Sequence, residues 1–237
     1  MPEPAYRRVI VKISGEALAG DRGFGIDDRA VHLMVGDLIN CHKLGTQIGV
    51  VVGGGNLLRG SQMDAMKFSR PVSDSMGMMA TVMNALVLEE AVTRAGVPAR
   101  SMSALTMPQV CETYERRRAL RHFDEGRIVI FGGGTGNPFF TTDTTAVLRA
   151  AEVDADVVLK ATNVDGVYDS DPKKNPNARR YDRISHKDAI DKDLQVMDAT
   201  AFALARENKT PIIVFSVREK GAIEAVLRGK GRATIVA

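Results

Sequence analysis

The chain has 237 residues, of which 44% are hydrophobic and 26% charged, and its formal net charge at pH 7 is +3. This length and composition suit a globular protein with a sizeable core, in one domain or in two closely joined lobes. Nucleic acid is not indicated as a partner, because acidic residues are interspersed with the basic ones. The one dense basic cluster is interpreted as a solvated helix face, with an anion site as the alternative. It consists of Arg116, Arg117, Arg118 and Arg121.

Cysteines and histidines give no sign of a metal centre. Cys41 and Cys111 lie far apart, without a CxxC pair or a histidine at ligand spacing, so neither a zinc site nor a disulfide framework is indicated. No apolar run is long enough to cross a bilayer, and we expect a cytoplasmic protein without a membrane partner. The four histidines are isolated, and we expect them at the surface or at helix caps rather than as ligands or general bases. They are His32, His42, His122 and His186.

Short β-branched runs alternate with amphipathic stretches along the chain. Strands are predicted, in chain order, at 8–13, 47–52, 99–102, 127–131, 157–160, 211–215 and 233–236. Helices are predicted at 27–44, 74–95, 143–152, 198–208 and 219–228. The methionine-rich run 76–83 predicts a helix packed on both sides, in the core or in a subunit contact. This alternation predicts an α/β fold with a parallel sheet, in which ligands bind at the carboxyl ends of the strands.

A glycine-rich loop, GGGTGNPFFTTD at 132–143, lies between a predicted strand and a predicted helix. Such a loop suits a phosphate group, since the backbone N–H groups approach the anion closely and the helix adds its positive dipole end. A tight strand-to-helix turn is the alternative. A second loop of this kind, Gly53–Asn56, follows the strand at 47–52. Two such loops suit two phosphate-bearing molecules.

The known nucleotide fingerprints are absent. Neither loop completes the dinucleotide pattern GxGxxG, and no Gly-Lys pair has the flanks of a Walker A motif. Lys12, Arg59 and Lys160 follow strands or glycine loops and supply three cations. Three cations with magnesium would offset the repulsion between ATP and an acceptor that is itself a phosphate. Such an acceptor is largely ionised at neutral pH, so no general base is required.

Five aspartates lie near predicted loop or element ends. For Asp143 and Asp198, a helix cap and a functional role stay equally open. Asp165 and Asp171 lie in the post-strand stretch ATNVDGVYDSDP, whose tyrosine and hydroxyl groups suit a nucleotide base and ribose. Asp74 precedes the methionine-rich run.

Six segments carry a resemblance over nearly the whole chain: KISGEAL, VVGGGNLLRG, MGMMATVMNAL, GTGNPFFTTD, ADVVLKATNVDGVYDSDP and VMDATAFALA. With them, the chain resembles the bacterial uridylate kinases of the amino acid kinase superfamily. The resemblance implies a three-layer αβα sandwich with a mainly parallel central sheet, as one continuous structural domain. A UMP-binding N-terminal lobe would span 1–155 and an ATP-binding C-terminal lobe 156–237. The implied reaction transfers the γ-phosphoryl group of ATP to UMP with Mg²⁺, giving UDP and ADP for pyrimidine nucleotide biosynthesis.

The resemblance also implies roles for single residues. Lys12 would be the main transition-state cation, with Lys160, Arg59 and Asp143 completing the catalytic group. Asp143 would act through magnesium or by positioning the lysines. The residues implied to bind ATP are Lys12, Ser14, Gly15, Gly55, Arg59, Thr162, Asn163, Tyr168 and Asp171. Those implied to bind UMP are Gly54, Asp74, Thr135, Gly136, Asn137, Pro138, Phe139, Phe140, Thr141 and Thr142. Asn163 departs from the lysine of many members, which affects the detail of the ATP contacts.

Assembly and regulation follow from the same resemblance. It implies a homohexamer built from dimers, with GTP as activator and UTP as inhibitor. The segment implied to respond to GTP comprises Gly20, Asp21, Arg22, Gly23, Phe24 and Gly25.

Two other functions stay open from the residues alone. A relative in the same superfamily that phosphorylates acetylglutamate, aspartate or carbamate should lack the Phe139–Thr142 wall for a base. A nucleotide-sensing module would bind through the same loops without turnover.

Overall fold

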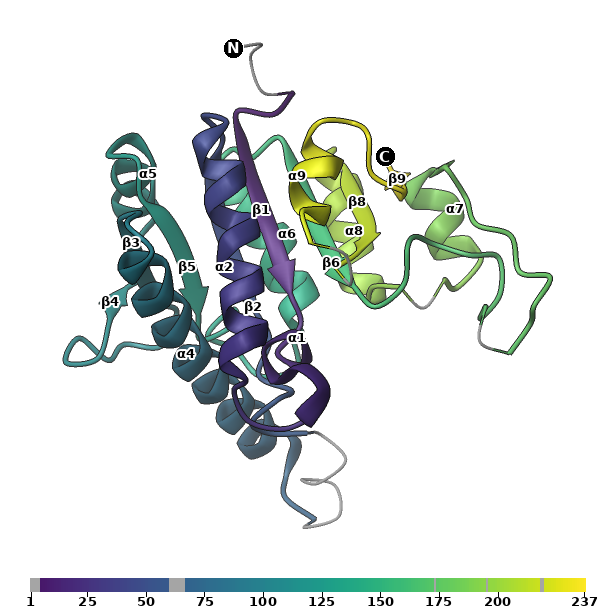
Figure 1. Cartoon of the computed structure of the whole chain (residues 1–237). Helices are drawn as coiled ribbons and strands as arrows, with labels where there is room; N and C mark the ends of the chain where they lie inside the picture. Colours follow the sequence, from purple (N-terminus) through teal and green to yellow (C-terminus); the bar gives the residue numbers. More distant parts are fainter. Residues whose placement is uncertain (1–4, 60–66, 173, 195, 218–219) are drawn as a thin grey trace.

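The computed structural model describes residues 5–59, 67–172, 174–194, 196–217 and 220–237 (Figure 1). Within these ranges a nine-stranded sheet has the order β4-β3-β5-β2-β1-β6-β8-β9-β7. Its strands are β1 (Arg8–Ile13), β2 (Gln47–Val52), β3 (Ala99–Ser103), β4 (Glu112–Thr113), β5 (Ile128–Gly132), β6 (Val157–Thr162), β7 (Arg183–Ile184), β8 (Ile212–Ser216) and β9 (Ala233–Val236). All neighbouring strands are parallel except β8 and β9. The predicted α/β class with a mainly parallel sheet is confirmed.

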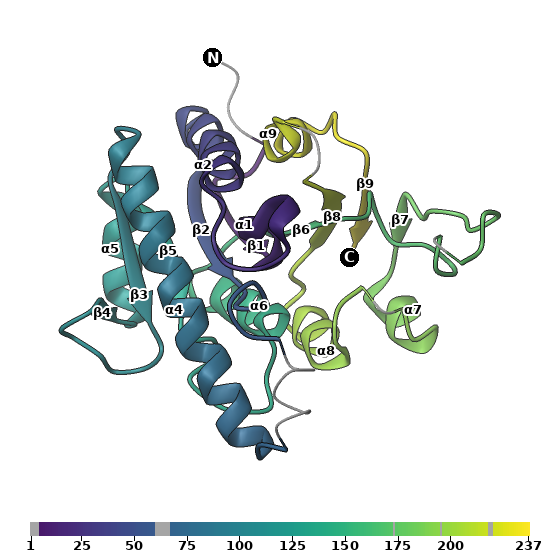
Figure 2. The same ribbon diagram turned by 60° about the horizontal axis from the view of Figure 1, so that its bottom comes forward.

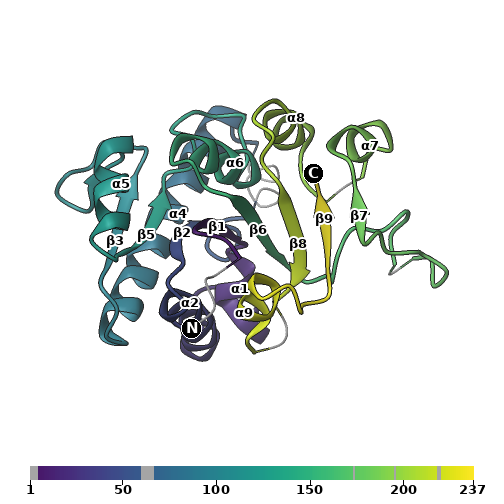
Figure 3. The same cartoon turned by 90° about the horizontal axis from the view of Figure 1, so that it is seen from above.

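Helices cover both faces of this sheet, which gives three layers (Figure 3). One face carries α2 (Asp28–Lys43), α4 (Arg70–Arg94) and α9 (Ala222–Leu227), and the other carries α5 (Arg116–Asp124), α6 (Thr142–Glu152) and α8 (Ala199–Glu207). Shorter elements are α1 (Glu16–Ala19), the 3₁₀ turn η1 (Gly20–Arg22) and α7 (His186–Asp191). In Figure 2 the carboxyl ends of the central strands come forward, next to α1 and the first turns of α4.

The core is divided by the sheet. Val9, Val11 and Ile13 of β1 pack with the cluster under α2, α4 and α9, whereas Ile10 packs with the cluster under α5, α6 and α8. Successive strand residues point to opposite faces, so a central strand covered on both sides is apolar nearly throughout. The exceptions in β1 are Arg8, at its first position, and Lys12, which lies on the same face as Ile10. A lysine in a buried strand marks a place where a charge is needed.

The predicted strands are found within two residues of their predicted ends. The helix predicted at 74–95 begins earlier, at Arg70, because Pro71 suits a first helical turn. The last helix starts at Ala222, and the predicted start at position 219 lies outside the described residues. The two-residue strands β4 and β7 and the short helical elements α1, η1 and α7 were not predicted, since so few residues carry no periodicity.

The basic cluster of α5 is exposed, as predicted. Two histidines correct the expectation of surface or capping positions. His122 is 5% exposed and contacts Glu112 and Arg127, and His186 is 6% exposed and bonds the Thr210 carbonyl. Apart from Arg127, the partners of these two histidines lie ten or more residues away in the sequence. Spacing along the chain therefore does not reveal that the two side chains are buried and bonded.

The sheet runs without a break across position 155, between the two predicted lobes. The lobe boundaries stay a prediction. No helix in the described ranges is long and apolar enough to span a bilayer.

Candidate active site

Two lysines and one aspartate meet at the carboxyl end of the central strands. Lys12 of β1 and Lys160 of β6 are opposite each other in the parallel register. Each stands two residues after a residue of the core under α6, Ile10 and Val158, so both side chains face α6. Lys12 Nζ lies 2.9 Å from Asp143 Oδ1, and Lys160 Nζ contacts Asp143 Oδ2. One carboxylate therefore holds two ammonium groups side by side.

Burial and charge oppose each other in this cluster. Burial would raise the pKa of the Asp143 carboxyl, but the ammonium groups of Lys12 and Lys160 outweigh it and hold that pKa below its ordinary value. Burial lowers the pKa of Lys160, against the opposing effect of Asp143. With two ammonium groups and one carboxylate the cluster has a positive formal charge, which suits an anion.

The start of α6 positions Asp143. The helix is capped by Thr141, whose Oγ1 accepts from the backbone N–H groups of Asp143 (3.1 Å) and Thr144 (3.2 Å). The cap alternative for Asp143 is therefore wrong. Asp198 caps α8 through Ala201 N–H at 3.0 Å, and it also accepts from the hydroxyl groups of Thr141 and Thr144. Asp198 thus joins the starts of α6 and α8 beside the lysine cluster.

The Gly53–Asn56 loop is packed tightly against its neighbours. A Cβ on Gly54 would lie 2.9 Å from both the Gly77 carbonyl and the Ala80 side chain of α4. At Gly55 the nearest such neighbour is Glu16, at 3.9 Å. The loop is therefore pressed onto α4 at Gly54 and has room at Gly55, where a ligand can approach.

The second glycine loop is held by side chains from two helices. Gly133 N–H donates to Thr81 Oγ1 of α4 at 2.8 Å, and the buried Arg149 of α6 donates to the Gly134 carbonyl at 3.3 Å. Farther along, Phe139 N–H donates to Asp74 Oδ2 of α4 at 2.7 Å. Phe139 has φ +73°, a left-handed conformation that is uncommon for a bulky residue. Strain of this kind persists where neighbouring contacts fix the backbone.

A pocket of about 400 Å³ opens between the two glycine loops and α4. Its lining includes half of the residues predicted to bind UMP, which are Gly54, Asp74, Phe140, Thr141 and Thr142. Gly55 and Arg59, from the predicted ATP side, also line it. Thr135 to Phe139, all in the described ranges, are outside that lining. Thr135 and Asn137 bond each other, and Gly136 closes a turn onto Gly133.

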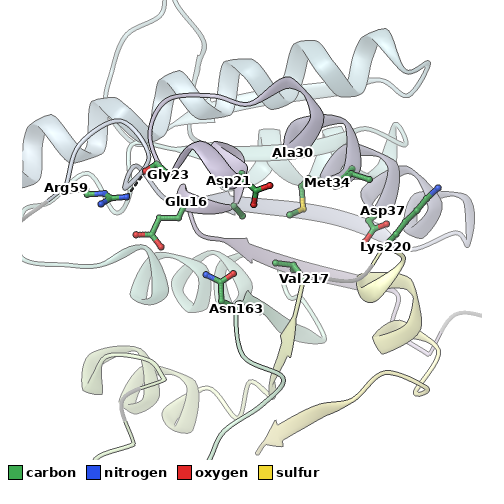
Figure 4. Close-up of a pocket in the computed structure, with 13 residues that line it drawn as sticks. Glu16, Asp21, Gly23, Ala30, Met34, Asp37, Arg59, Asn163, Val217 and Lys220 are labelled. Atoms are coloured by element: carbon green, nitrogen blue, oxygen red, sulfur yellow. Dashed lines mark hydrogen bonds between the residues drawn. The ribbon is translucent and has the colours of Figure 1, made fainter. Parts of the chain in front are cut away.

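A larger pocket of about 680 Å³ lies on the α2 side of the sheet edge (Figure 4). Arg59 lines it, and its guanidinium donates to the Gly23 carbonyl at 2.6 Å. Asp21 and Asn163 line the same pocket and come from opposite sides of it. The structure thus brings Arg59 to the 20–25 segment, and it brings Lys12, Lys160 and Asp143 together as a separate group.

The rest of the predicted ATP side lies at the end of β6, in the stretch after it, and directly after β1. Thr162 Oγ1 exchanges hydrogen bonds with the backbone of Val164, and Tyr168 Oη donates to Asp165 at 2.6 Å. Tyr168 and Asp171 line a third pocket of about 530 Å³. Ser14 and Gly15 follow β1, where their carbonyls accept from the first turn of α1.

Four residues that hold the site were not singled out from the sequence. Asn56 and Asn84 are fully buried and bond each other, Thr81 holds Gly133, and Arg149 holds Gly134. Asn56 ends the glycine loop and Asn84 lies in the quoted run MGMMATVMNAL, but no local pattern pairs them. A polar residue on the buried face of an otherwise apolar helix is the one available signal.

Comparison with known proteins identifies the family of the chain. The amino acid kinase family matches residues 7–216 of the chain. The uridylate kinase of Bradyrhizobium sp. strain BTAi1 is 62% identical over 237 residues, which is the full length of both proteins. The crystal structure of UMP kinase from Ureaplasma parvum has a TM-score of 0.94 and 38% identity, covering 98% of each chain. That of UMP kinase from Bacillus anthracis has a TM-score of 0.94 and 36% identity, covering 98% of this chain and 96% of the other. The chain therefore belongs to the amino acid kinase family, in its uridylate kinase branch.

Proposed function

We propose that this protein is a kinase that transfers the γ-phosphoryl group of ATP to UMP, giving UDP and ADP in pyrimidine nucleotide metabolism. The observation that carries the substrates is full-length similarity, at 62% identity, to a uridylate kinase. The observation that carries the chemistry is the pair of lysines held by Asp143 at the carboxyl ends of the central strands, where the glycine loops begin. A UMP kinase needs positive charge between two anions, and this cluster supplies it.

The reaction follows from the acceptor's own charge. A phosphate oxygen of UMP attacks the γ-phosphorus of ATP, and the bond from that phosphorus to the β–γ bridging oxygen breaks with its electron pair leaving on ADP. The acceptor phosphate is largely ionised at neutral pH, so no side chain has to remove a proton. Lys12 and Lys160 stabilise the charge that spreads over the transferring group. Asp143 keeps both ammonium groups at the same edge of the sheet.

Magnesium would reach the site on ATP, where it neutralises phosphate charge. Asp143 does not suit direct ligation of Mg²⁺, because each of its oxygens already contacts an ammonium group and a divalent cation there would be repelled. In the described part of the chain, no group of three or more His, Cys, Asp or Glu side chains is arranged to hold a metal. Of the two roles predicted for Asp143, we propose that of positioning the lysines.

The substrates are assigned to the two sides of the cluster. We propose UMP in the pocket between the glycine loops, with its phosphate at Gly54 and its ribose at Asp74. Asp74 already binds Phe139 N–H, so it also fixes the Phe139–Thr142 wall. ATP would lie along the ends of β1 and β6. The residues on its phosphates would be Ser14, Gly15, Gly55 and Arg59. Thr162, Asn163, Tyr168 and Asp171 would surround its nucleoside.

Assembly and regulation are further parts of this proposal. The face of α4 carrying Val72, Met79 and Met83 is apolar and about half exposed, which supports a subunit contact within the proposed homohexamer of dimers. Activation by GTP would act through the 20–25 segment, which bonds Arg59, and UTP would inhibit as a product-like nucleotide. The proposed location is the cytoplasm.

An ADP-release assay tests the function. The protein is mixed with ATP, Mg²⁺ and one acceptor at a time: UMP, CMP, acetylglutamate, aspartate or carbamate. Among these acceptors, we expect only UMP to give rapid release of ADP. We expect this release to stop when EDTA removes the metal. Rapid turnover with an amino acid or carbamate would assign a different member of the family. Nucleotide binding by calorimetry without turnover would assign a sensing module.

A further inference from the structure

Two fully buried asparagines form a closed hydrogen-bonded pair beside the first glycine loop. Asn84 Nδ2 of α4 donates to Asn56 Oδ1 at 2.7 Å, and Asn56 Nδ2 donates back to Asn84 Oδ1 at 3.1 Å. The remaining amide hydrogens bond the loops on either side: Asn84 Nδ2 donates to the Gly53 carbonyl at 2.7 Å, and Asn56 Nδ2 to the Gly25 carbonyl at 2.8 Å. All four side-chain N–H groups therefore have an acceptor.

The carbonyls at the two ends determine which way the amides point. Gly25 and Gly53 each present an oxygen to the pair, so each amide must turn its nitrogen outward and the two amides must complement each other in between. Reversing either amide would set oxygen against oxygen in a place without access to water. The pair has one satisfied arrangement, and a fully satisfied buried network of this kind is rigid.

Three segments of the proposed site meet at this pair. Gly25 N–H donates to the Asn56 carbonyl at 2.8 Å, so the 20–25 segment is joined to Asn56 by two hydrogen bonds. Gly53 N–H donates to the Ile13 carbonyl at 2.9 Å, which ties the glycine loop to the end of β1. A Cβ on Gly15 would lie 2.5 Å from Asn56 Oδ1, so the Asn56 side chain also forms the wall behind the Lys12–Gly15 stretch.

We propose that Asn56 and Asn84 are positioning residues, and that the pair holds the Gly53–Gly55 loop and the 20–25 segment in one shared arrangement for phosphoryl transfer. The kinetic consequence rests on the proposed function, whereas the coupling between the segments does not. Losing Asn84 leaves the Gly53 carbonyl and Asn56 Oδ1 without their donor. Asn56 then turns, and Gly25 loses its partner. A change on α4 thus reaches a segment that Asn84 itself does not bond.

Hydrogen exchange read by mass spectrometry tests the coupling. We expect Asn84→Ala to speed exchange in the peptide covering 20–27 by about tenfold or more, because the Gly25 N–H bond depends on Asn56 staying in place. Leu88→Ala is the control, since Leu88 is a fully buried residue one turn farther along the same helix. It should loosen α4 and leave the 20–27 peptide at the parent rate. Equal exchange in Asn84→Ala and parent, or equal acceleration by Leu88→Ala, would overturn the proposal.

Kinetics test the positioning. At a temperature where circular dichroism shows every variant folded, Asn84→Ala and Asn56→Ala should each lower kcat about tenfold with a smaller change in KM for UMP. Leu88→Ala should stay within about twofold of the parent. The double variant should lose little more than either single one, because the two residues act as one unit. Additive losses, or unchanged kcat in both single variants, would contradict the positioning role.

A substitute variant and a separate readout keep failure to fold and failure of the proposed function distinct from failure of the coupling. Asn84→Ser retains a short hydroxyl donor and replaces Asn84→Ala in both measurements if the alanine variant gives no folded protein. A parent protein that releases no ADP with UMP would refute the proposed function, and the exchange of the 20–27 peptide would still decide the coupling.

Discussion

The proposed UMP pocket and the proposed ATP nucleoside pocket are held in different ways. On the UMP side, one helix reaches every loop: α4 holds Gly53 through Asn84, Gly133 through Thr81 and Phe139 through Asp74. On the ATP side, the stretch after β6 has a local bond between Tyr168 and Asp165. It is also tied to the β9 region, through the ion pair of Arg232 with Asp165 and the bond from Val167 N–H to Thr234 Oγ1. One helix that bonds several loops fixes them together, whereas the ATP-side stretch is fixed by separate contacts that do not involve α4. We therefore expect substitutions on the UMP side to spread and those on the ATP side to stay local.

The largest expected effect is at the cluster between the two sides. Lys12→Ala should lower kcat by about a thousandfold and leave the calorimetric Kd for UMP within a few fold, because its charge matters most while the phosphoryl group is in transfer. Lys43→Ala, an exposed lysine at the end of α2, serves as the control. Equal losses in kcat and UMP affinity would place Lys12 in ground-state binding.

Asp143→Asn should destabilise the fold by about 3 kcal/mol at neutral pH, since two buried ammonium groups lose their shared partner. The folded-state pKa of Asp143 lies below its ordinary value, so its stabilising effect is complete above that ordinary value and is lost as pH falls through the folded pKa. The difference in Tm between parent and variant should therefore shrink as pH falls below about 4. A difference that grows on acidification would contradict the assignment. Asp154→Asn, at an exposed ion pair, is the control.

Asp74→Ala should raise the Kd for UMP about tenfold, because the carboxylate both faces the pocket and fixes Phe139 N–H. The KM for ATP should change little. Ser75→Ala, at the next position of α4, is the control. Unchanged UMP binding by calorimetry would remove Asp74 from the site.

Tyr168→Phe should have the smallest effect, raising the KM for ATP about threefold, because one local hydrogen bond to Asp165 is lost. The Kd for UMP should not change. Tyr181→Phe serves as the control. It removes another tyrosine hydroxyl group, which accepts a hydrogen bond from Lys192. A rise in the Kd for UMP would show that the two sides are coupled, against the contrast drawn between them.

Local patterns were enough to place most of the elements. The strands at β1, β2 and β9 were predicted with their observed ends, and both glycine loops lie at the carboxyl ends of strands as predicted. Runs of β-branched residues and glycine-rich turns are formed by residues close together in the sequence, so the sequence alone reveals them. The same patterns did not predict β4, β7, α1, η1 and α7, which are too short to show a period.

The sequence predicted the candidate site only in part. Lys12, Lys160 and Asp143 were each singled out, and the resemblance implied lysine positioning as one of two roles for Asp143. That both lysines contact this one carboxylate came from the structure. Arg59 was grouped with them, and in the structure its guanidinium bonds the Gly23 carbonyl. Its role toward ATP stays a prediction. The helix-cap alternative was right for Asp198 and wrong for Asp143, because Thr141 precedes it as the cap.

From the sequence alone came the α/β class, the glycine loops and the identity of the charged residues, since each depends on residue type and short-range order. Only the tertiary structure decided that Lys12 and Lys160 share one carboxylate and that Asn56 and Asn84 close a pair. Those contacts depend on strand register and on helix packing across long separations in the chain. These contacts are favourable because a buried amide or ammonium group without a partner costs free energy.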